Sequence, residues 1–94
     1  MVNRMILALL LKIKDEVESV YNAIEAQLNS DTPECEAIRD AIDKLKSIER
    51  LVENEEALTP YMESLLEDIM IYINEIYELK DDIEKVCPEL ADSL

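Results

Sequence analysis

Several residue types are missing from this chain of 94 residues, and each absence excludes a kind of site. Without glycine, the sequence has no phosphate-binding P-loop, no dinucleotide-binding fingerprint and no EF-hand loop. Without histidine, it cannot carry out Ser-His or Cys-His catalysis, and it lacks ordinary zinc and di-iron sites on helices. Phenylalanine and tryptophan are also missing. We therefore expect a protein that is not an enzyme, with no catalytic, cofactor-binding or metal-binding residues.

Basic residues are scarce, with 9 Lys and Arg against 23 Asp and Glu, which gives a net charge of −14. This charge repels phosphate backbones and anionic lipids, so we expect neither direct nucleic-acid binding nor membrane binding. Long hydrophobic runs are also lacking, because the apolar stretch Met5–Leu11 is far shorter than a membrane span. That stretch also lacks the longer apolar core and small-residue cleavage site of a signal peptide. The sequence predicts one domain, residues 1–94, in the cytoplasm, or in the host cytoplasm if the protein is viral.

Two Thr-Pro pairs divide the chain into helices. Thr32-Pro33 and Thr59-Pro60 each place a capping hydroxyl before a proline at the first helical position. Pro88 should end the last helix, and the six residues after it should fray. The sequence therefore predicts three helices, at about 3–29, 33–56 and 60–87.

The apolar residues of the third helix alternate in steps of four and three, a spacing typical of coiled-coil packing. The first and second helices carry similar apolar stripes, and the short connections require neighbouring helices to run antiparallel. We therefore expect an all-α fold, an antiparallel up-down-up three-helix bundle with coiled-coil-like heptad packing. The heptad positions of the third helix are Leu58, Met62, Leu65, Ile69, Tyr72, Ile76, Leu79, Ile83, Val86 and Leu90.

Two segments are apolar on all sides, Met5–Leu11 and Ile69–Ile73. In the predicted topology they lie at similar heights and could form one outward patch, which on a small protein usually marks an interface. The simplest use is a homodimer through the first and third helices. The alternatives are that both segments belong to the core, or that the patch receives a helix from a different protein. The predicted interface residues are Met5, Leu7, Leu11, Met70, Ile71, Ile73 and Tyr77.

Acidic residues are concentrated between Leu51 and Leu79, where no basic residue occurs, whereas residues 1–14 contain three bases and no acid. Arg4 and its neighbours can neutralise only part of this charge. The remaining acidic surface could simply keep the protein soluble, or it could attract a basic protein partner. Carboxylates along a rigid rod can imitate a phosphate backbone, as in a DNA-mimicking inhibitor of a virus or mobile element. The predicted acidic surface comprises Glu53, Glu56, Glu63, Glu67, Asp68, Glu75 and Glu78.

Two groups of acids share helical faces and raise a third, weaker hypothesis, that of a carboxylate-dependent Mg²⁺ enzyme. Because the heptad positions are apolar, these acids should point outward rather than into a cleft. The two groups are Glu49, Glu53 and Glu56, and Glu75, Glu78 and Asp82.

The two cysteines, Cys35 and Cys87, should lie at the same end of the bundle. A disulfide between them is permitted by the topology, but the sequence alone cannot show that their Cα atoms come close enough. The alternative is a pair of reduced, buried, small apolar side chains.

The leading functional hypothesis is a non-catalytic interaction or assembly module that self-associates. The nucleic-acid mimic is the alternative.

Overall fold

The computed structural model describes residues 4–53 and 60–94, and every regular element within these ranges is helical. The expectation of an all-helical protein is thereby confirmed. The elements are α1 (Arg4–Leu28), α2 (Cys35–Glu53), α3 (Pro60–Glu78), α4 (Lys80–Val86) and the 3-10 turn η1 (Pro88–Leu90).

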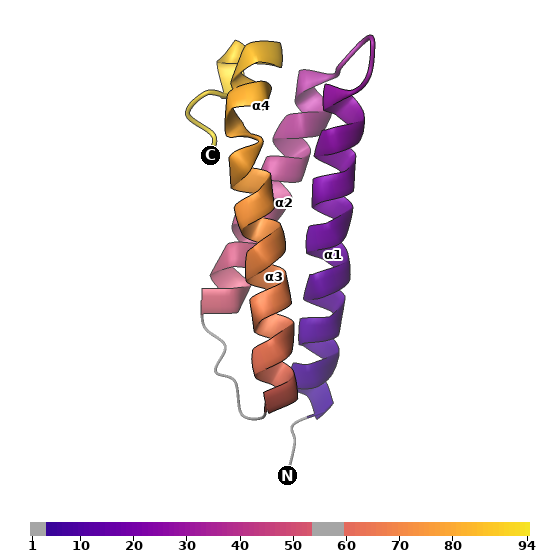
Figure 1. Ribbon diagram of the computed structural model, residues 1–94, viewed down its shortest axis with the longest axis vertical. Coiled ribbons are helices and arrows are strands. Elements are labelled where there is room, and N and C mark those ends of the chain that lie inside the picture. The colour runs from indigo at the N-terminus through magenta and orange to yellow at the C-terminus, as the bar shows by residue number, and fades with distance from the viewer. Residues whose placement is uncertain (1–3, 54–59) are drawn as a thin grey trace.

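The three long helices pack together along one axis, and the molecule measures 49 × 21 × 17 Å (Figure 1). The end of α1, the start of α2 and the C-terminal segment lie near one end, while the start of α1 and the start of α3 lie near the other (Figure 1). α1 packs closely against both α2 and α3, whereas in the described part of the chain α2 and α3 approach each other closely at few places. This unequal spacing leaves room for a groove between α2 and α3.

The core consists of apolar side chains that recur every three or four residues on each helix. α1 contributes Leu10, Ile13, Val17, Val20 and Ile24, all of them buried. Within the described residues no polar or charged side chain is buried, so the core needs no internal hydrogen bonds. Burying each Leu or Ile stabilises the fold by about 1.5–3 kcal/mol. The remaining core residues are Ile38, Ala41, Ile42, Leu45, Ile48, Met62, Leu65, Ile69, Ile73, Ile76, Ile83, Cys87 and Leu90.

The predicted heptad positions are not equally buried. Met62, Leu65, Ile69, Ile76, Ile83 and Leu90 lie in the core. Tyr72, Leu79 and Val86 are only half-buried and pack against its edge, and Leu58 lies outside the described residues. Ile73 is buried in addition, so the buried face of α3 is wider than a strict heptad stripe.

α2 starts later than predicted, at Cys35 rather than at Pro33. The backbone N–H of Glu34 donates a hydrogen bond of 2.8 Å to Oε1 of Gln27, near the end of α1. The backbone N–H of Thr32, the predicted cap, instead donates to Oγ of Ser30 at 3.1 Å. The acceptor at the start of α2 therefore comes from the preceding helix, which the Thr-Pro pattern did not indicate.

The predicted helix 60–87 starts at Pro60 as expected, but it is interrupted at Leu79. The N–H of Leu79 donates to the carbonyl of Ile76 at 3.0 Å, three residues back, which makes a tighter turn than an α-helix. Thr59, the predicted cap, lies outside the described residues. The interruption divides the predicted third helix into α3 and α4.

The chain end also differs from the expectation of fraying. Pro88–Leu90 forms a 3-10 turn, and Leu90 is buried in the core. Its N–H donates to the carbonyl of Cys87 at 2.9 Å, and its own carbonyl accepts from the N–H of Ser93 at 3.0 Å. Burial of Leu90 accounts for the order of this segment, which helix propensity alone could not predict.

None of the helices in the described ranges has the length and apolar character needed to cross a membrane.

Candidate functional site

The predicted interface residues fall into three groups by exposure. Met5 (82% exposed), Ile71 (54%), Met70 (44%) and Leu11 (41%) present large apolar side chains to solvent. Leu7 and Tyr77 are half-buried and pack against the core. The third group is Ile73 alone, which is buried, so three of the seven predicted residues are wholly or partly covered within the chain itself.

Ile73 was predicted to face outward, and this prediction is wrong, because its side chain is only 4% exposed. It lies four residues after Ile69 and three before Ile76, both of which are buried. Residues at these spacings share one face of a helix, so Ile73 belongs to the core-facing side of α3. The apolar run around it offered no periodic signal that distinguished buried from exposed positions.

Ile71 lies on the side of α3 that faces α1. Together with Tyr72 and Glu75 it lines a shallow hollow that also includes Lys14 and Asp68. Nζ of Lys14 lies 3.3 Å from a carboxylate oxygen of Asp68, which joins α1 to α3. Leu11 precedes Lys14 by one helical turn, so Leu11 and Ile71 are on the same side of the molecule.

Met70 is next to Ile71 in sequence and shares a depression on the exposed surface of α3 with it, but Met70 also borders the space between α3 and α2. It lines a groove of about 420 Å³, which we name the α2–α3 groove. The residues around this groove are Glu49, Val52, Glu53, Met70, Ile73, Asn74 and Tyr77. Met70 and Ile71 therefore share the exposed surface of α3, and the predicted patch extends from the side of α1 across α3 to the groove.

The sequence did not indicate the groove, because Val52 falls on the apolar stripe of the second predicted helix and Glu49 in one of the acidic groups considered for Mg²⁺. A signal was present, since Glu49 and Glu53 are four residues apart and lie on one helix face beside Val52. One carboxylate oxygen of Glu49, Oε1, is shielded from solvent and has no hydrogen-bond partner among the described residues. What the sequence could not show is that α2 and α3 separate enough to leave this space.

Lys46 and Tyr77 form a contact at the margin of the groove. Nζ of Lys46 donates a hydrogen bond of 2.8 Å to the Tyr77 hydroxyl and lies 5.1 Å from the centre of its ring. The hydrogen bond from the ammonium group raises the pKa of Lys46 above 10.5, and the charge of Glu49 adds to this effect. Tyr77 thus has a partner on α2 within its own chain.

Tyr21 of α1 and Tyr72 of α3 pack edge to face, with ring centres 6.3 Å apart and an interplanar angle of 61°. A hydrogen bond to the Glu25 carboxylate raises the pKa of Tyr21 above 10.0. The negative charges of Glu25, Glu75 and Glu78 also oppose ionisation of its hydroxyl. The aromatic contact contributes to α1–α3 packing on the same side of the bundle as the Lys14–Asp68 ion pair.

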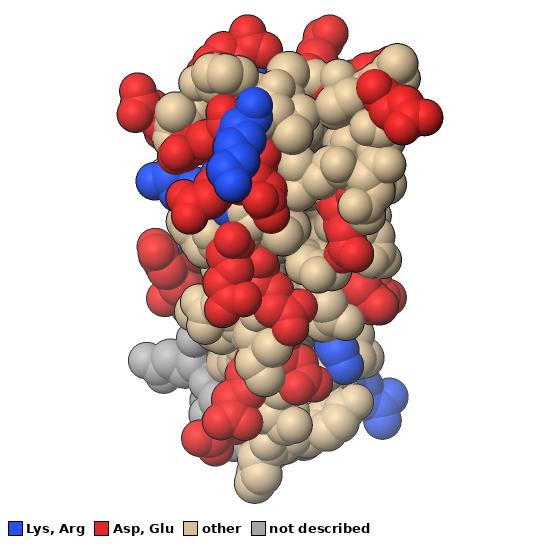
Figure 2. Space-filling model, turned by 45° about the horizontal axis from the view of Figure 1, so that its top comes forward, with Lys and Arg blue, Asp and Glu red and all other residues tan. Residues whose placement is uncertain are grey.

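The predicted acidic residues do not form one isolated cluster. Glu53, Glu63, Glu67 and Glu78 are exposed. Asp68 is paired with Lys14, and Glu75 is half-buried beside them. Figure 2 shows carboxylates spread over the face in view, with few basic side chains among them. Glu56 lies outside the described residues.

Glu63 and Glu67 lie along the exposed surface of α3. They share a shallow depression with Leu66, Met70 and Ile71. Exposed carboxylates therefore flank the exposed apolar side chains of α3, which means that any partner covering this helix must contact both.

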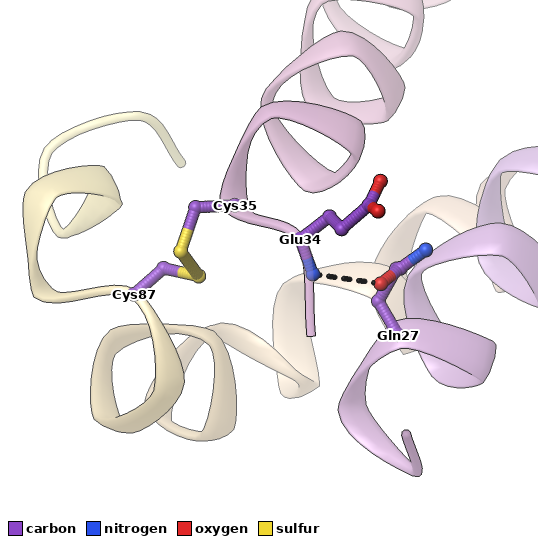
Figure 3. The surroundings of a disulfide bond; sticks show 4 residues. All are labelled: Gln27, Glu34, Cys35 and Cys87. Carbon is purple, nitrogen blue, oxygen red and sulfur yellow. Dashed lines mark hydrogen bonds between the residues drawn. A yellow bond between two sulfur atoms is a disulfide. The ribbon is translucent and has the colours of Figure 1, made fainter. Parts of the chain in front are cut away.

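The structure joins Cys35 and Cys87 in a disulfide, with their Cα atoms 5.8 Å apart (Figure 3). Cys87 is fully buried and Cys35 is half-buried. The bond connects the first residue of α2 to the residue that follows α4, beside the Glu34–Gln27 hydrogen bond (Figure 3). The two cysteines therefore link the start of α2 covalently to the end of α4.

Within the ranges that the structure describes, no group of three or more His, Cys, Asp or Glu side chains is arranged to hold a metal ion. No family model matches this chain, and no curated protein or solved structure is significantly similar to it.

Proposed function

We propose that this protein is a non-catalytic protein–protein interaction or assembly module, an antiparallel up-down-up bundle that self-associates through α1 and α3. The observation that carries the proposal is the exposure of Leu11, Met70 and Ile71, each more than two-fifths exposed on these two helices. Large apolar side chains gathered on the surface of a small protein usually mark an interaction site. Closed twofold dimers are the commonest assemblies that cover such a surface.

The antiparallel arrangement is supported by the short connections between the helices and by the position of their ends in Figure 1. The coiled-coil-like character is supported by the burial of Met62, Leu65 and Ile69, three successive heptad positions of α3. These features would give a rigid scaffold on which the exposed surfaces of α1 and α3 keep a fixed geometry.

Light scattering during size-exclusion chromatography tests the self-association. We expect a mass of about twice 10.8 kDa for the wild-type protein. Added salt should favour the dimer, because it screens the repulsion between two chains of charge −14. A monomer at every protein and salt concentration would overturn the proposal.

A double variant, Leu11→Glu with Ile71→Glu, should be monomeric and should remain helical by circular dichroism. The matched control is Leu51→Glu, which introduces a carboxylate at an α2 position that is 45% exposed. The control should keep the wild-type mass. If the control dissociates as readily as the double variant, added charge rather than a specific surface is responsible.

The second candidate function is a nucleic-acid mimic that blocks the basic groove of another protein. It is supported by the exposed carboxylates of Glu53, Glu63 and Glu67 and by the absence of basic residues between Leu51 and Leu79. Such a mimic should displace duplex DNA from a basic DNA-binding protein, with a steep dependence on salt. Changing Glu63, Glu67 and Glu75 to Lys should abolish the displacement, and unchanged displacement would exclude this candidate.

A further inference from the structure

The α2–α3 groove combines an apolar lining with carboxylates along one wall. Val52 of α2 and Met70 and Ile73 of α3 supply the apolar surface. Glu49 and Glu53, one helical turn apart, supply the carboxylates on the α2 side. The groove is thus suited to a ligand that carries apolar and positively charged groups together.

One carboxylate of the groove is only partly satisfied by hydrogen bonds within the described residues. Oε1 of Glu49 is shielded from solvent and has no hydrogen-bond partner among the described residues. Lys46 is one turn away on α2, but its ammonium group donates to the hydroxyl of Tyr77. A carboxylate oxygen that is shielded from water and lacks a hydrogen bond gains more from an incoming ammonium or guanidinium group than one that is already solvated.

The groove continues along α3 rather than ending as an isolated pocket. Met70 and Asn74 line both the groove and the neighbouring depression that contains Leu66, Glu63 and Glu67. The combined surface therefore follows the axis of α3, with apolar side chains in the middle and carboxylates on its borders. An amphipathic helix matches this shape, because its apolar residues recur along one face with positive charges on either side.

The charge of the molecule distinguishes between the two kinds of helix that could fill this surface. A second copy of the chain carries a net charge of −14, and its α2 and α3 would bring further carboxylates against Glu49, Glu53 and Glu67. A helix rich in Lys and Arg would instead be attracted, both on approach and when bound. Charge complementarity therefore favours a basic partner over a second copy in this groove.

We propose that the α2–α3 groove is a docking site for a basic amphipathic helix of another protein. The groove shares Met70 with the self-association surface described above, and Ile71 borders its extension along α3, but Leu11 and Ile71 do not line the groove itself. The Leu11→Glu, Ile71→Glu variant therefore disrupts self-association without changing a groove residue. The apolar face of the incoming helix packs on Val52, Met70 and Ile73, while its Lys and Arg side chains pair with Glu49 and Glu53.

The test uses a fluorescent synthetic peptide of about 18 residues, five helical turns, with leucines along one face and lysines on the others. A second peptide has the same composition in a scrambled order that forms no apolar stripe. Fluorescence anisotropy with the full chain should show the amphipathic peptide binding at least about tenfold more tightly than the scrambled one. Equal binding of the two peptides would overturn the proposal, because it would show attraction to acidic surface alone.

Two matched pairs of substitutions test whether the amphipathic peptide binds in the groove. Glu49→Gln with Glu53→Gln should weaken binding of the amphipathic peptide by about tenfold. Asp40→Asn with Asp43→Asn removes the same charge from exposed positions of α2 outside the groove, and it should have an effect of about twofold or less. Equal weakening by both variants would contradict a groove-specific contact.

A third variant, Val52→Asn, tests the apolar part of the site and should weaken the amphipathic peptide while leaving binding of the scrambled one unchanged. Circular dichroism confirms that each variant remains folded. Light scattering without peptide tests whether a second copy of the chain, rather than a basic helix, occupies the groove. A loss of dimer in the Glu49→Gln, Glu53→Gln variant, with wild-type mass in Leu11→Glu, Ile71→Glu, would show that a second copy fills the groove and would overturn the proposal.

Discussion

The ammonium group of Lys46 lies 2.8 Å from the hydroxyl of Tyr77, and this hydrogen bond links α2 to α3 where the two helices border the groove. It also gives Tyr77 a partner within its own chain, although the residue had been predicted to contact a second molecule. The same contact can be tested through its contribution to stability.

Replacing Tyr77 by Phe removes the hydrogen bond but keeps the ring. We expect a loss of about 0.5–1.5 kcal/mol in the free energy of unfolding, measured by chemical denaturation at neutral pH. Since folding raises the pKa of Lys46, the stabilisation is present below pH 10.5 and is lost as the pH rises through the raised pKa. The difference between wild type and Tyr77→Phe should therefore shrink at alkaline pH, and a constant difference would contradict this.

The pKa of Tyr21 should lie above its ordinary value of 10.0. Its hydroxyl is hydrogen-bonded to the Glu25 carboxylate, and the negative charges of Glu75 and Glu78 also oppose its ionisation. Ultraviolet absorbance during alkaline titration measures ionisation of the tyrosines, and Tyr21→Phe identifies the contribution of this residue. Glu25→Gln should lower the pKa of Tyr21 toward 10.0. Glu18→Gln, a change at an exposed position of the same helix, is the control and should leave the titration unaltered.

The burial of Ile73 and the exposure of Ile71 predict opposite responses to the same substitution. Ile73→Ala should lower the free energy of unfolding by about 2–5 kcal/mol, because it leaves a cavity in the core. Ile71→Ala should change it by less than about 0.5 kcal/mol when the protein is monomeric. Denaturation of the two variants side by side tests the assignment, and equal losses would place both residues in the core.

The disulfide between Cys35 and Cys87 should be a main source of stability, because it joins residues 52 positions apart. The chain-entropy model gives about 4 kcal/mol for a loop of this length. Reduction should therefore lower the melting temperature by about 15 °C or more. Cys35→Ala with Cys87→Ala should melt at a similarly reduced temperature and should be insensitive to reductant, and an unchanged wild-type melting temperature on complete reduction would contradict the prediction.

Periodicity predicted the helical character and most of the core, because each helix buries residues at the spacing that its pitch imposes. Ile13, Val17 and Ile24 are examples, because they recur at helical spacing in the sequence and are all buried on α1. Periodicity failed at Ile73, where every neighbour from Ile69 to Tyr72 is apolar, so no polar position marked the outer face. The relative burial of such residues depends on how closely adjacent helices approach, which is a property of the packed bundle.

The helix ends were harder to predict than the helices themselves. Capping rules considered only residues local to each end, and so they assigned the start of α2 to Thr32 and Pro33. The structure uses Gln27, seven residues before Glu34, as the acceptor. The groove was missed for a similar reason, because its walls come from Glu49 and Met70, which are far apart in the sequence and become neighbours only in the folded chain.

The disulfide has a further consequence for the covalent structure of the molecule. Because it joins the first residue of α2 to the residue after α4, the polypeptide from Cys35 to Cys87 is a closed ring from which α1 extends as a tail. Both walls of the α2–α3 groove belong to the ring. A protease that cuts one peptide bond between the two cysteines would leave a single covalent molecule, with α2 and α3 still joined, until the disulfide is reduced.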